Sequence, residues 1–156
     1  MLYFKLLGME INLNCDLGEK SKHHSNENDP ELLKIVNSAN VACGYHAGDE
    51  QTMQEVVKIS KENNVSIGAH PSFKDPENFG RKRMDLSASE ITKLVTDQYE
   101  ILQNIASLQG EKVSHIKPHG ALNNMACEDL ELAKTLAKTI YHIDKDIIYL
   151  VPTGSK

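Results

Sequence analysis

Cysteine is scarce in this chain of 156 residues, and the three that occur, Cys15, Cys43 and Cys127, have no CxxC spacing. An odd number of cysteines without paired spacing supports neither a disulfide framework nor a thiolate zinc site. A reducing compartment is the setting that fits such a chain best. We therefore expect a cytoplasmic protein.

Long hydrophobic runs and an excess of basic residues are absent as well. No stretch approaches the roughly 18 apolar residues of a membrane span. The opening segment 1–8 lacks the long apolar core and the small-residue cleavage site of a signal peptide. The formal net charge is -5, and the 17 basic residues are scattered along the chain. These features give no reason to expect a membrane or a nucleic acid as a partner.

Apolar residues are nevertheless plentiful, at 40% of the chain, which is typical of one compact globular domain. Strand-like runs at 11–15, 39–43, 65–69, 113–117 and 147–151 alternate with helical patterns. Asp29 and Pro30 mark the start of the first helix, a capping box at Ser87 marks the third, and the last covers 133–141. This order predicts parallel strands joined by right-handed crossovers.

The two faces of each strand differ in polarity, and this difference distinguishes a barrel from a doubly wound sheet. A sheet covered by helices on both sides is apolar at nearly every position. Here Leu13 and Cys15 alternate with Asn14 and Asp16, and the later strands alternate similarly, with Val113 expected on the same face as His115. We predict an α/β fold of the parallel (β/α) barrel class, with a site at the C-terminal mouth. Five strands cannot close such a barrel, which favours a fragment over an open sheet.

Polar side chains gather where the strands end, as barrel enzymes require when several strands aim groups at one small substrate. A lysine on a strand that faces the lumen is rarely buried without a partner or a task. A long loop over the mouth often forms a lid, and an arginine there can clamp a carboxylate or a phosphate. The candidates are Asn14, Asp16, Glu19, His46, Asp49, His70, Arg81, Lys117 and His119.

Several of these residues also have a purely structural explanation. Asp16 is suited to capping a turn, and Asp49 to capping the second helix. His46 and His70 fit hydrogen-bonded core positions, and Arg81 fits a solvated basic loop. Motifs of zincins, P-loop proteins and serine hydrolases are missing. Asp16, His46 and His70 together also suit a divalent metal ion, because their carboxylate and imidazole groups come from three adjacent strands.

Five motifs, in this order, resemble those of the LamB/YcsF family: NLNCDLGE, SANVACGYHAGD, IGAHPSF, ENFGR and HIKPHGAL. The resemblance runs from Met9 to the end of the chain. It implies a seven-stranded (β/α) barrel related to the glycoside hydrolase/deacetylase superfamily. Family members are considerably longer, so the resemblance implies a truncated barrel over 9–156 with about five β/α units, preceded by an extension over 1–8.

Bacterial members of this family are the A subunits of 5-oxoprolinases. The resemblance therefore implies ATP-dependent hydrolysis of 5-oxo-L-proline to L-glutamate together with B and C subunits, with ATP and Mg²⁺ as co-substrate. It suggests that Lys117 and His119 bind anionic oxygen or protonate the leaving group, and that Asp16 is a base or an orienting carboxylate. The predicted substrate-binding residues are Asn14, Glu19, His46, Asp49, His70 and Arg81.

Two alternatives remain open at the level of the sequence. One is a metal-dependent deacetylase or amidohydrolase of the same superfamily that works without ATP. The other is an inactive truncated remnant that binds partner subunits without turnover. Three positions depart from the usual family pattern, namely Lys20, Asn123 and Pro152, and none belongs to the predicted charged set.

Overall fold

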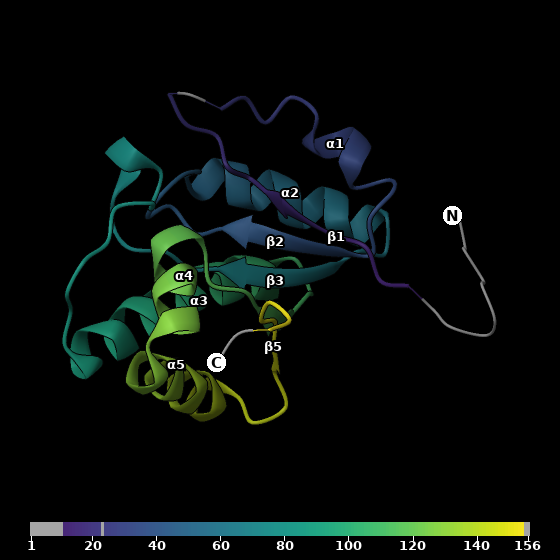
Figure 1. Cartoon of the computed structure of the whole chain (residues 1–156). Coiled ribbons are helices and arrows are strands. Elements are labelled where there is room, and N and C mark those ends of the chain that lie inside the picture. Colours follow the sequence, from purple (N-terminus) through teal and green to yellow (C-terminus); the bar gives the residue numbers. More distant parts are fainter. Residues whose placement is uncertain (1–10, 23, 155–156) are drawn as a thin grey trace.

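In the part of the chain that the structure describes, the sheet has five parallel strands in the order of the chain, and Figure 1 shows helices packed around it. The computed structural model describes residues 11–22 and 24–154, so the predicted extension over 1–8 lies outside the described residues. Each strand is parallel to the one before it. The strands are β1 (Asn14–Leu17), β2 (Ser38–Ala42), β3 (Ser66–His70), β4 (Val113–Ile116) and β5 (Ile148–Tyr149).

Helices connect these strands and pack side by side, with α3 in contact with both α2 and α5. They are α1 (Asp29–Leu32), α2 (Glu50–Glu62), the 3-10 turn η1 (Pro76–Asn78), α3 (Ala88–Leu108), α4 (Gly120–Glu128) and α5 (Leu130–Ile143). The predicted capping box is confirmed, since Ser87 and Glu90 bond each other's backbone N–H groups at the start of α3. Helix α4 was not predicted. It begins directly after the strand-end motif, with His119 at its N-cap.

The strand order confirms the barrel class. In a doubly wound sheet the order reverses at a switch point, whereas here every crossover moves one strand further in the same direction. Within the described part of the chain, β1 and β5 form the two edges of the sheet. The fold is therefore α/β, of the parallel (β/α) barrel type, with five strands in these residues.

The core lies between the sheet and the helices. Apolar side chains of the strands, such as Val41 and Ile67, belong to one cluster with Val57 of α2 and Leu102 of α3. These four side chains are almost fully buried. Each large apolar side chain removed from water contributes roughly 1.5–3 kcal/mol. Packing on this face therefore holds the sheet in place and leaves the opposite face for polar groups.

Strand β4 contains a bulge that corrects one prediction. Val113 pairs with Ile67, but the next step of β3, Gly68, pairs with His115, so Ser114 is an extra residue. A bulge puts two residues of one strand opposite a single residue of its partner, so the residues beyond it change faces. Val113 consequently packs in the core, while His115 faces the polar side. Our expectation that both share a face was wrong because strict alternation fails at a bulge.

The first strand and helix also differ from prediction. The first strand was predicted over 11–15, but β1 starts at Asn14, which pairs with Ser38, the first residue of β2. The side chain of Ile11 lies before the strand and is exposed to solvent. The cap of α1 is Asn28, and the Asp29 carboxylate accepts a hydrogen bond from the backbone N–H of Gly18. Strand β5 is shorter than expected, with only two residues in the sheet. Local pattern therefore located these elements but misplaced their ends.

None of the helices in the described ranges has both the length and the apolar character that crossing a membrane requires.

Candidate active site

Four side chains from four successive strand ends meet at one point. Glu19 follows β1, His46 follows β2, His70 ends β3 and His119 follows β4. Oε1 of Glu19 lies 3.2 Å from Nε2 of His46, 3.4 Å from Nδ1 of His119 and 3.8 Å from Nε2 of His70. The rings of His46 and His119 stack, with centroids 4.0 Å apart. We call these four residues the histidine cluster. All four were singled out from the sequence.

A second polar group lies beside the histidine cluster and is more open to solvent. Nζ of Lys117 donates to Oδ1 of Asp16 at 2.6 Å, and both side chains are about one-third exposed. Oδ2 of Asp16 lies 3.5 Å from Nε2 of His70, so the two groups adjoin. Lys117 and Asp16 are therefore the charged residues best placed to contact a small molecule at the strand ends.

Asn40 on β2 connects the polar residues of three strands. Its Nδ2 donates to Oδ1 of Asn14 at 2.9 Å and to Oδ1 of Asp16 at 2.8 Å, while its Oδ1 lies 3.0 Å from Nε2 of His115. The side chain is fully buried. Asn40 was not among the predicted site residues, although its position on the polar face of the second strand was a usable signal. Its contacts hold the Asp16 carboxylate in place.

The loop between β3 and α3 folds down onto the histidine cluster. The backbone carbonyl of Phe79 lies 2.9 Å from Nε2 of His119. Gln98 of α3 anchors the loop by bonding both the N–H and the carbonyl of Ser72. At Gly80, where φ is +65°, a Cβ would lie 2.0 Å from Oγ of Ser72 and 2.9 Å from Cβ of His46. Only glycine fits there, so the tight approach of the loop depends on that residue.

Burial and neighbouring charges shift the titration of these groups. Burial raises the pKa of the Asp16 carboxyl, but the hydrogen bonds and charges of His70 and Lys117 outweigh it and hold that pKa well below its usual range. The pKa of Glu19 is also lowered: burial opposes this, and the histidines outweigh burial. Burial, with help from the neighbouring histidines, lowers the pKa of His119 to about 4. Ionised carboxylates thus lie beside a neutral His119 ring at neutral pH.

Two predicted site residues lie apart from these groups. The Asp49 carboxylate caps α2, accepting hydrogen bonds from the backbone N–H and the hydroxyl of Thr52 at 2.7 Å each. That is the structural alternative considered for this residue. Arg81 is exposed, with its guanidinium 5.3 Å from the ring centre of Phe79. Arg81 thus belongs to the loop that covers the histidine cluster, and its substrate-binding role stays a prediction.

The side chains that could hold a metal ion differ from the predicted set. The donor atoms of Glu19, His46, His70 and His119 all lie within 4.8 Å of one another. Asp16, which we had predicted as a ligand, is outside this group and bonds Lys117 and Asn40 instead. The sequence pattern could not decide which carboxylate contacts all three histidines, because Asp16 and Glu19 both lie at the end of the first strand.

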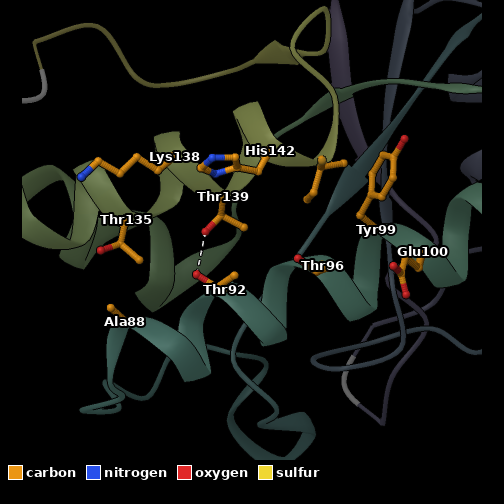
Figure 2. Close-up of a pocket in the computed structure, with 10 residues that line it drawn as sticks. Ala88, Thr92, Thr96, Tyr99, Glu100, Thr135, Lys138, Thr139 and His142 are labelled. Carbon is orange, nitrogen blue, oxygen red and sulfur yellow. Dashed lines mark hydrogen bonds between the residues drawn. The ribbon is translucent and has the colours of Figure 1, made fainter.

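A groove elsewhere on the surface lies between α3 and α5 and contains none of these groups (Figure 2). Its threonine side chains Thr92 and Thr139 bond each other at 2.9 Å across the two helices. His142 and Lys138 of α5 also line it. Because its walls come from the helices and not from the strand ends, we do not assign the polar chemistry of the protein to it.

Comparisons with known proteins identify the family of the chain. A sequence model of the LamB/YcsF family matches residues 11–156. The 5-oxoprolinase A subunit of Staphylococcus carnosus is 44% identical over 90% of this chain and 56% of its own length. The corresponding protein of Nitrobacter hamburgensis is 45% identical over 95% and 58%. This chain therefore spans just over half the length of these relatives.

A solved structure is similar as well. The lactam utilization protein of Thermus thermophilus superimposes with a TM-score of 0.89 at 37% sequence identity, over 94% of this chain and 60% of that protein. The matched family region includes the whole histidine cluster together with Asp16 and Lys117. On these grounds the chain belongs to the LamB/YcsF family.

Proposed function

We propose that this chain is part of the A subunit of a 5-oxoprolinase, which hydrolyses the cyclic amide of 5-oxo-L-proline to L-glutamate with consumption of ATP. The proposal rests on relatives that are named as A subunits of 5-oxoprolinase and share 44–45% identity over at least 90% of this chain. B and C subunits are the proposed partners, and ATP with Mg²⁺ is the proposed co-substrate.

The chemistry explains why such a reaction needs ATP. A lactam is an unreactive amide, and phosphorylation of its oxygen turns its carbon into a better electrophile. The protein must then hold a substrate carboxylate, phosphate charge and a water molecule close together. A fixed cation beside an orienting carboxylate is suited to that task, since preorganised charge stabilises the charge that develops during reaction.

Lys117 is the residue that we propose to bind anionic oxygen. Its ammonium group is partly exposed and is held by Asp16 at 2.6 Å. The low pKa of Asp16 makes it a weak proton acceptor at neutral pH, which supports an orienting role over that of general base. Asn40 and Asn14 in turn position that carboxylate.

His119 lies at the predicted strand end, inside the histidine cluster. Both of its ring nitrogens are in contact with protein atoms, Nε2 with the carbonyl of Phe79 and Nδ1 with Nε2 of His70. His46 and His70 are buried beside it, and Glu19 is half-buried. We therefore propose that His119 acts with the histidine cluster, while Arg81 reaches the substrate from the covering loop.

The histidine cluster also favours the second candidate function, a metal-dependent deacetylase or amidohydrolase. Three imidazoles and one carboxylate are a ligand set that suits a hydrolytic divalent ion. This candidate needs no ATP, which separates it cleanly from the first.

One assay distinguishes the two. Formation of glutamate from 5-oxoproline is measured for the full-length protein with ATP, with and without B and C subunits, and acetate release from acetylated sugars is measured without ATP. We expect glutamate only in the complete mixture. Absence of glutamate there would overturn the main proposal, and metal-dependent acetate release would establish the second.

A further inference from the structure

The histidine cluster has a feature that hydrolysis of a lactam does not by itself require: its imidazole lone pairs converge. Nδ1 of His70 lies 2.5 Å from the backbone carbonyl of Lys117, and Nε2 of His119 lies 2.9 Å from the carbonyl of Phe79. A carbonyl oxygen only accepts hydrogen bonds, so each of these nitrogens carries the ring proton. In a neutral imidazole the second nitrogen then has a lone pair.

Those second nitrogens face each other. Nε2 of His70 and Nδ1 of His119 are 3.0 Å apart, and neither has a proton to give when both rings are neutral. Oε1 of Glu19, which is also an acceptor, points to the same place from 3.4 Å and 3.8 Å. Three acceptors in contact repel one another unless a positive charge lies between them.

The spacing of these atoms suits a metal ion. Bonds of 2.0–2.1 Å in a tetrahedral zinc site place neighbouring ligand atoms about 3.3 Å apart. The ligand atoms here are separated by 3.0–3.8 Å along the four contacts among Glu19 and the three histidines. Metal-binding histidines almost always donate their other N–H to a carbonyl or carboxylate, as His70 and His119 do.

We propose that Glu19, His46, His70 and His119 bind one divalent cation of the zinc class. Imidazole nitrogen and carboxylate oxygen are ligands that Zn²⁺ and Co²⁺ accept readily. When bound, such an ion supplies Lewis-acid chemistry beside Lys117 and Asp16. The proposal rests on the geometry of these four side chains and not on the proposed 5-oxoprolinase activity.

The four ligands are not equivalent. His46 contacts Glu19 through Nε2, but its Nδ1 is buried and has no hydrogen-bond partner among the residues that the structure describes. It therefore lacks the outer contact that orients His70 and His119. We expect His119 and Glu19 to contribute more to metal affinity than His46.

Metal binding by the purified protein tests the inference without any substrate. After removal of metal by a chelator, Co²⁺ is titrated in and its visible spectrum recorded, and Zn²⁺ content is measured after dialysis. We expect one equivalent per chain, with the intense visible bands of four-coordinate Co²⁺. Less than one Co²⁺ or Zn²⁺ ion bound per chain at micromolar metal concentration overturns the proposal. A proton shared between His70 and His119 would then be the positive charge that holds the cluster together.

Variants locate the site. Glu19→Gln keeps the size of the side chain and removes its charge, and His119→Gln removes a fixed nitrogen donor. Loss of a group that only hydrogen-bonds a metal ligand weakens metal affinity roughly 10–100-fold. We expect each of these variants, which lose a ligand itself, to weaken Co²⁺ binding by more than that. His142→Gln changes an exposed histidine and is the control, with unchanged binding expected. Undiminished affinity in Glu19→Gln, with the fold verified by circular dichroism, overturns the assignment even if His119→Gln does not fold.

Discussion

Nζ of Lys117 lies 2.6 Å from Oδ1 of Asp16, although the two residues are 101 positions apart and two strands separate β1 from β4. In a flat sheet, strands three positions apart would be roughly 14 Å from each other. The contact shows that the sheet curves so that its strand ends converge, as in a barrel. Curvature thus places a partly exposed cation against the carboxylate that orients it.

Replacing Lys117 by alanine should abolish most activity with little loss of stability. The ion pair is partly exposed, and such pairs contribute about 0–1 kcal/mol to folding. Loss of a group that stabilises developing negative charge costs about 10²–10³-fold in turnover. ATP-dependent glutamate formation and urea unfolding measure the two effects. Lys93→Ala, which breaks an exposed pair with Asp97 on α3, is the control and should leave turnover unchanged. Turnover of Lys117→Ala close to that of the parent would exclude the proposed role of Lys117 in the reaction.

Gly68→Ala should destabilise the fold through a single methyl group. A Cβ at this position would lie 2.1 Å from the His115 ring, which packs against the bare backbone of β3. Overpacking of this kind typically costs about 1–3 kcal/mol. The free energy of unfolding in urea measures it. Ser66→Ala, at an exposed position of the same strand, should stay within about 0.5 kcal/mol of the parent. Equal stability of both variants would show that His115 moves aside freely.

His115 should make the protein acid-sensitive above pH 4. Burial, reinforced by the charges of His70 and Lys117, lowers its pKa to about 4 from an ordinary value of 6.5. Between these pH values the unfolded chain binds a proton at His115 that the folded chain does not bind. The contribution of His115 to the free energy of unfolding is therefore fully present above pH 6.5 and is lost as the pH drops toward 4. The size of this contribution is on the order of 1–3 kcal/mol.

Unfolding free energies at pH 7 and pH 4.5 test this contribution. Each variant is compared with its own value at pH 7, so that an overall loss of stability does not matter. His115→Gln should lose less than the parent over this interval, because it lacks the titrating ring. His142→Gln should follow the parent. A decline in His115→Gln as steep as that of the parent would assign the acid sensitivity to other groups.

Ser87→Ala should weaken the start of α3 by about 1 kcal/mol. The Ser87 hydroxyl accepts from the backbone N–H of Glu90, and the Glu90 carboxylate accepts from the N–H of Ser87, so the change breaks one half of a reciprocal cap. Thermal unfolding measures the loss. Ser87→Gly is the matched comparison, because glycine at an N-cap costs only a few tenths of a kcal/mol. Melting of Ser87→Ala at the same temperature as the parent would show that the hydroxyl contributes nothing.

Features that depend on neighbouring residues could be predicted from the sequence. The cap at Ser87, the apolar faces of α3 and α5, and the order of strands and helices are local signals, since helix and strand periods repeat within a few residues. The same alternation placed Lys117 and His119 on the polar side of the fourth strand's end. The strand-end rule of parallel barrels then indicated that they share one site with Asp16 and His46.

Which of these residues touch one another depends on tertiary contacts. The bulge at Ser114 results from pairing with β3 and turns His115 to the polar face, opposite to Val113 in the core. Glu19 contacts all three histidines of the cluster, whereas Asp16 adjoins His70 and is held by Lys117 and Asn40 from other strands. Contacts between strands and loops far apart in sequence determine these positions, and no local period records them. Curvature of the sheet is the physical reason that polar strand ends become a single site.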